Sequence, residues 1–136
     1  MTEDDIKTDR PITRWAIDLS WYPQRERSIS ALLQGCLCDT CRKQLNKESN
    51  QPLDSELLNR IRECCKNSAD FITGQMPILE SVFRFFIASG NESMTVEELG
   101  RHLSERRGDD TPRTSEGILL RLLKNDRYYG FRPVLD

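Results

Sequence analysis

Five cysteines in a chain of 136 residues restrict the fold more than any other feature of this sequence. Cys38 and Cys41 are separated by two residues, and Cys64 and Cys65 are adjacent to each other. Two thiolates at the C-x2-C spacing can bind the same ion, and a tetrahedral zinc site needs four such ligands. The 22 residues between the two pairs are enough for a loop and a helix to fold back. The sequence therefore predicts one structural zinc ion per chain, bound by these four cysteines.

The fifth cysteine, Cys36, leaves the set of ligands open, because it could substitute for Cys64 or Cys65. Adjacent residues on a helix point about 100° apart, so Cys64 and Cys65 can both reach one ion only near a helix end. An iron–sulfur cluster is an alternative to zinc. The cysteines could also be buried thiols without a metal, since free cysteine is among the residue types most often buried.

The chain carries no sign of export or of a membrane span. Its first ten residues, MTEDDIKTDR, are acidic and contain no apolar h-region, and no apolar run approaches the length that crosses a bilayer. We therefore expect residues 1–13 to form a disordered tail and the protein to be cytoplasmic. Because that compartment keeps thiols reduced, the cysteines are not expected to form stable disulfides.

Hydrophobic periodicity predicts an α+β fold that is mainly α. In residues 14–22 the apolar side chains alternate with polar or small ones, which is typical of a half-buried strand. Helices are expected over residues 25–34 and 54–66, with a tight cysteine-bearing turn and a polar loop between them. Residues 67–75 then connect this first segment, 14–75, to the rest of the chain.

Residues 76–136 predict three helices followed by a strand. Leu79, Val82, Phe83 and Phe86 recur at the spacing of a buried helical face. A T-x-x-E capping box opens the second helix at Thr95, and that helix is expected to end near Gly108. Thr114 or Ser115 caps the third helix, and RYYGFRPV reads as a final strand.

This order of elements resembles the winged-helix branch of helix-turn-helix domains. The matching segments are TVEELGRHL for the second helix, TSEGILLRLL for the third and YYGFRPV for a wing strand. The resemblance implies that the third helix binds DNA, with the cations around it as contacts: Arg113, Arg121, Lys124 and Arg127. Only one wing strand fits after the third helix. Either residues 92–95 or residues 14–22 could pair with it, and the second pairing would join both ends of the chain in one domain.

The charge of the chain favours a protein partner over DNA. The formal net charge is −2. The four cations around the third helix face four carboxylates, Asp109, Asp110, Glu116 and Asp126. Because DNA affinity comes largely from phosphate neutralisation, a locally neutral face supplies little of it.

The sequence contains no P-loop, G-x-G-x-x-G, H-E-x-x-H or G-x-S-x-G motif. The only histidine, His102, reads as a partly exposed helix residue. We therefore expect no enzyme, but a small zinc-stabilised protein that binds another protein. A winged-helix DNA-binding regulator is the first alternative, and a thiol redox sensor is the second.

Overall fold

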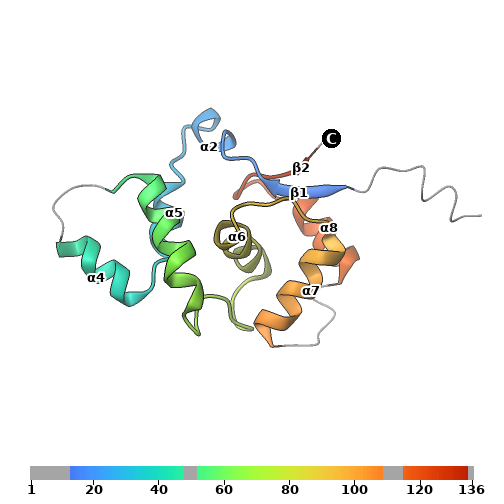
Figure 1. Cartoon of the computed structure of the whole chain (residues 1–136). Helices are drawn as coiled ribbons and strands as arrows, with labels where there is room; N and C mark the ends of the chain where they lie inside the picture. The colour runs from blue at the N-terminus through green and yellow to red at the C-terminus, as the bar shows by residue number, and fades with distance from the viewer. Residues whose placement is uncertain (1–12, 48–51, 109–114, 135–136) are drawn as a thin grey trace, which may run out of the picture.

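The computed structural model describes residues 13–47, 52–108 and 115–134, and it is mainly helical with a two-stranded antiparallel sheet (Figure 1). This confirms the predicted mainly helical α+β class. The predicted tail lies almost wholly outside the described residues. The elements are β1 (Arg14–Ile17), α2 (Trp21–Gln24), α3 (Ser30–Gly35), α4 (Asp39–Lys47), α5 (Asp54–Glu63), the 3-10 turn η1 (Cys65–Asn67), α6 (Ile78–Ala88), α7 (Val96–Arg107), α8 (Glu116–Lys124) and β2 (Phe131–Val134).

The sheet joins the two ends of the described chain, as one of the two predicted pairings requires. β1 pairs with β2 in a register that runs from Arg14 opposite Val134 to Ile17 opposite Phe131. On its other side β1 forms a bridge between Trp15 and Met94, so residue 94 pairs with β1 and not with the final strand. β1 is therefore the central strand of this small assembly.

The predicted strand over residues 14–22 is wrong beyond Ile17. The Asp18 carboxylate accepts hydrogen bonds from the backbone N–H and the hydroxyl of Ser20, at 3.0 and 2.6 Å, which turns the chain. The short helix α2 follows, and it buries the consecutive residues Trp21 and Tyr22. Two neighbouring side chains can both face a core from a helical turn, whereas a strand would send them to opposite faces.

The segment before the second cysteine pair also differs from the prediction. The expected helix over residues 25–34 is confined to α3, and Glu26 has a positive φ of 56° in the link before it. The expected cysteine-bearing turn is mostly the helix α4. α5 ends at Glu63, three residues before the predicted end, and η1 follows it.

Helix α6 lies at the centre of the molecule, between α5 on one side and α7 on the other (Figure 1). Its predicted apolar face is confirmed, since Val82, Phe83 and Phe86 are buried. The buried Arg107 of α7 binds the connector before α6: its guanidinium donates to the carbonyl oxygens of Met76 and Gly74 at 2.7 and 3.0 Å.

The predicted ends of the last two helices are confirmed where the structure describes them. Thr95 and Glu98 form the capping box of α7, and Gly108 ends that helix in the left-handed conformation at a φ of 70°. Ser115 is the N-cap of α8, whereas Thr114 lies outside the described residues. Among the described helices, none is long and apolar enough to cross a membrane.

Candidate metal centre

Cys38 and Cys41 are presented by the junction between α3 and α4. α3 ends at Gly35, and Cys38 is the last residue before α4 begins. Cys41 lies in the first turn of α4 and is buried, while Cys38 is half-buried. A hydrogen bond from the backbone N–H of Cys41 lowers the pKa of the Cys38 thiol to about 7. The junction thus stabilises the thiolate form of Cys38, which is the form that binds metals.

Cys64 and Cys65 lie where the α-helical geometry of α5 breaks down. Cys64 has φ −129° and ψ −60°, outside the α-helical region, and η1 starts at the next residue. Cys64 is exposed, whereas Cys65 is fully buried. The break at the helix end lets the two adjacent side chains approach the same point, as their spacing requires.

The sulfurs of the two pairs lie close together. The Sγ atoms of Cys38 and Cys64 are 3.8 Å apart, and those of Cys38, Cys41 and Cys64 all lie within 4.8 Å of one another. The Sγ of Cys65 accepts a hydrogen bond of 3.1 Å from the backbone N–H of Cys38. Zinc–sulfur bonds of about 2.3 Å in a tetrahedron place the sulfurs about 3.8 Å apart. The four cysteines therefore lie close enough together to bind a metal ion.

Proximity and burial oppose the loss of several protons from these thiols. The contact with the Cys38 sulfur raises the pKa of Cys64 to about 11, and burial raises the pKa of Cys65 to about 12. Negative charges on neighbouring sulfurs repel one another. A bound cation removes this repulsion, and coordination deprotonates a thiol outright. The donor set therefore fits a thiophilic metal ion.

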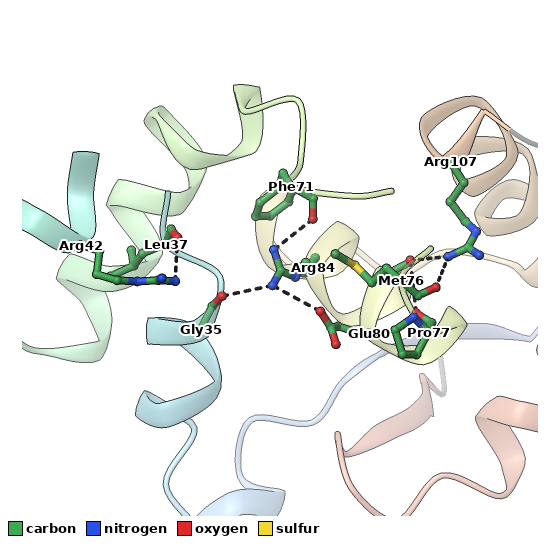
Figure 2. A network of polar contacts seen from close by, with 10 residues as sticks. Gly35, Leu37, Arg42, Phe71, Met76, Pro77, Glu80, Arg84 and Arg107 are labelled. Atoms are coloured by element: carbon green, nitrogen blue, oxygen red, sulfur yellow. Dashed lines mark hydrogen bonds and ion pairs between the residues drawn. The ribbon is translucent and has the colours of Figure 1, made fainter. Parts of the chain in front are cut away.

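Two arginines, Arg42 and Arg84, fix the backbone around the centre (Figure 2). Arg42 donates to the carbonyl oxygen of Leu37 at 3.1 Å. Arg84, from the core helix α6, donates to the carbonyl oxygens of Gly35 and Phe71, both at 3.1 Å. Arg84 also forms an ion pair of 3.3 Å with Glu80. A lone arginine within the apolar face of α6 was the sequence signal for this role.

Both arginines also line a polar hollow of about 320 Å³ beside the cysteines. Cys38 and Cys65 contribute to its wall, as do Asp39 and Asp70. The lining thus combines two cations with two carboxylates. Solvent reaches the edge of the centre from this side.

Cys36 lies apart from the other four cysteines. It is buried, and this burial raises its pKa to about 11. The charged groups that act on it are Arg84 and Glu80, and it lines both the polar hollow and a second one with Phe83 and Tyr129. It is not among the described cysteines whose sulfurs lie within 4.8 Å of one another. The geometry thus gives no support to Cys36 as a substitute ligand.

The candidate DNA contacts are only partly described. Arg121 and Lys124 are exposed on α8, and Arg127 is exposed in the turn after it. Arg113 lies outside the described residues. The carboxylate of Asp126 accepts the backbone N–H groups of Tyr128, Tyr129 and Phe131, so it shapes the turn before β2.

The remaining candidate, His102, is exposed on α7, and its ring stacks on Phe85 at 4.9 Å between centroids.

Comparison with known proteins finds no relative: no family model, no curated protein and no solved structure matches the chain.

Proposed function

We propose that this chain is a small zinc-stabilised protein that binds another protein. One structural zinc ion per chain is held by Cys38, Cys41, Cys64 and Cys65. The observation that carries this proposal is the meeting of two cysteine pairs from separate helical segments, with Cys38 and Cys64 sulfurs 3.8 Å apart. That separation suits a tetrahedral zinc–thiolate site.

A site with four thiolates is structural, because it leaves no position open for water or substrate. Its effect on the fold follows from the position of the ligands. Cys38 and Cys41 lie at the start of α4, whereas Cys64 and Cys65 directly follow the end of α5. The ion therefore stabilises the packing of α4 against the end of α5, and its binding free energy adds to the free energy of folding.

Surface features support a protein as the partner. A mostly apolar hollow of about 410 Å³ lies between the N-terminal helices and α5, and Leu19, Ile29 and Leu58 contribute to it. Leu19, which lines this hollow, is 47% exposed. Exposed apolar side chains beside a concave apolar surface are typical of protein-interaction sites.

The winged-helix DNA-binding regulator remains the alternative, supported by the order of α6, α7, α8 and β2. Met94 lies between α6 and α7 in the chain, and its bridge to Trp15 places it beside β1. A winged helix carries its first strand at this position between its first two helices. The neutral charge around α8 argues against this alternative, because phosphate contacts supply most of the affinity of DNA-binding proteins.

Elemental analysis of the purified full chain tests the metal centre. We expect one zinc per chain, and partial unfolding when a chelator removes it, seen as a loss of helical circular dichroism. Protein that folds fully and contains no zinc would contradict the proposal. If the analysis finds iron and sulfide in place of zinc, the centre is an iron–sulfur cluster and not a zinc site.

The choice of partner is tested with Leu19→Asp. We expect a protein captured by the wild-type chain to be lost by this variant, which keeps its zinc and its circular dichroism spectrum. Arg101→Asp is the matched control, because it places the same carboxylate at an exposed position of α7. Tight binding to a DNA duplex that weakens steeply with salt would instead favour the regulator.

A further inference from the structure

We propose that the metal centre is also a peroxide-sensitive switch, in which oxidation joins Cys38 to Cys64, releases the zinc and loosens α4 beyond its disulfide-linked start. This inference rests on the proposed zinc centre and adds regulation to it. Three observations carry it: the exposure of the four sulfurs, their separation, and the position of α4.

The four cysteines differ in their access to solvent. Cys64 is exposed and Cys38 is half-buried, whereas Cys41 and Cys65 are 4% and 0% exposed. A small oxidant dissolved in water therefore meets Cys64 first. The Cys38 sulfur lies 3.8 Å from it, and a disulfide needs these atoms to approach to about 2.05 Å. Little movement is required, because Cys64 lies where the helix has already broken.

Hydrogen peroxide oxidises this pair in two balanced steps. The Cys64 thiolate attacks one peroxide oxygen, the O–O bond breaks, and a sulfenic acid and a hydroxide ion form. The Cys38 thiolate then attacks the Cys64 sulfur, the S–O bond breaks, and the disulfide and a second hydroxide form. Two thiolates lose two electrons to one peroxide, and two solvent protons convert the hydroxides to water.

The disulfide removes two of the four zinc ligands. Thiolates bind zinc, and the sulfurs of a disulfide carry no such charge. Cys41 and Cys65 alone cannot complete a tetrahedral site, so the ion leaves. Cys36 does not take part, because it is buried and is not one of the clustered cysteines.

Release of the ion affects α4 most, because this helix has few other attachments. Its inward residues are the buried Cys41 and the half-buried Leu45, and its other seven residues are exposed. A hydrogen bond of 2.7 Å from Arg60 to Gln44 is a further link. In Figure 1, α4 stands at the edge of the molecule, away from α6, α7 and α8. α4 carries Arg42, Lys43 and Lys47, so the switch would reposition a basic helix.

The test treats the zinc-loaded full chain with equimolar hydrogen peroxide in the presence of a chromogenic zinc indicator. We expect one zinc released per chain, two thiols lost, and a Cys38–Cys64 cross-linked peptide after digestion without reductant. Added dithiothreitol and zinc should restore the starting state. Zinc retained after oxidation, or a disulfide between other cysteines, would overturn the switch.

Two variants sharpen this test. Cys36→Ser should release zinc as the wild type does, because Cys36 lies outside the cluster. Cys64→His keeps a fourth zinc ligand but removes the exposed thiol, so peroxide should release its zinc at least about tenfold more slowly. Equal release rates would overturn the assignment of Cys64. Freshly purified wild-type protein without zinc would contradict the proposed centre itself, which is a different outcome from a zinc-loaded protein that resists peroxide.

Discussion

Cys64 and Cys65 are neighbours in the chain, yet one is exposed and the other is fully buried. The end of α5 at Glu63, just before both residues, explains how both can approach the Cys38 and Cys41 sulfurs. That a helix must end there follows from the sequence alone, because adjacent helical side chains diverge by about 100°. Which of the two becomes exposed depends on the packing of η1 against the core, and no local pattern indicates it.

At the level of single residues, we expect Cys65→Ser to abolish stoichiometric zinc binding, because a serine hydroxyl is a poor zinc ligand and the remaining thiols form an incomplete site. Cys36→Ser is the matched control and should retain one zinc per chain. Elemental analysis of both variants, with guanidinium unfolding, measures the effect. Loss of zinc from the Cys36 variant alone would show that the set of ligands is wrongly assigned.

Asn91 is a second residue whose role is visible only in three dimensions. Its side-chain amide accepts the backbone N–H of Ile17 and donates to the Ile17 carbonyl, both at 2.9 Å, so it acts as one more strand partner for β1. Asn91 also has a positive φ of 58°, a region that asparagine tolerates better than most residues. In the sequence, Gly90-Asn91 is typical of a helix end, and it does not indicate this contact.

We expect Asn91→Ala to lower the free energy of unfolding by about 2–3 kcal/mol, since it removes two hydrogen bonds and places alanine at a positive φ. Asn91→Gly relieves the backbone strain but also loses both bonds, so it should be less destabilising. Urea unfolding of the wild type and the two variants measures the contribution of the hydrogen bonds and that of the backbone strain. Equal stability of the alanine variant and the wild type would mean that the amide contributes nothing to β1.

Among the secondary-structure elements, those with strong periodicity or explicit caps could be predicted, and those held by long-range contacts could not. The apolar face of α6 and the capping box of α7 are local signals, and both are confirmed. α4 was missed because only Cys41 and Leu45 face inward, which is too few for a helical pattern. The end of β1 was missed because the exposed Leu19 continues an alternation that the Asp18 turn has already broken.

The capping box of α7 makes a pH-dependent contribution to stability. Hydrogen bonds from Thr95 lower the pKa of Glu98, so this contribution is present above its unfolded pKa of about 4.3 and is lost as the pH falls through the lower folded value. We expect Thr95→Ala to cost about 1 kcal/mol at pH 7. Its cost should shrink below pH 4, and urea unfolding of variant and wild type at each pH measures it. If the cost of Thr95→Ala stays constant down to pH 2.5, the stabilisation by Thr95 does not depend on the ionisation of Glu98.

At the scale of the whole molecule, the pairing of β1 with β2 could be predicted as one of two options, whereas the way the metal centre joins the core could not. Arg84 makes that connection, since it reaches from α6 to the carbonyl oxygens of Gly35 and Phe71 (Figure 2). A lone arginine within the apolar face of α6 indicates a polar contact there, but the sequence does not indicate its partners, because they are backbone atoms far away in sequence. The centre and the core are thus linked through polar contacts that do not depend on a metal.

This arrangement predicts how the molecule responds when its metal is removed. The Arg107 hydrogen bonds join α7 to the connector before α6, and β1 pairs with β2; neither set of contacts includes a cysteine ligand. α4 instead depends on Cys41 for most of its burial. Local openings differ in free energy across a protein, and hydrogen exchange separates them. Chelation should therefore accelerate amide exchange in α4 and η1 while α6 and α7 stay protected, as read by mass spectrometry of the full chain with and without chelator. Uniform loss of protection would instead mean that the ion stabilises the entire fold, and unchanged exchange in α4 would mean that its few side-chain contacts suffice to hold it.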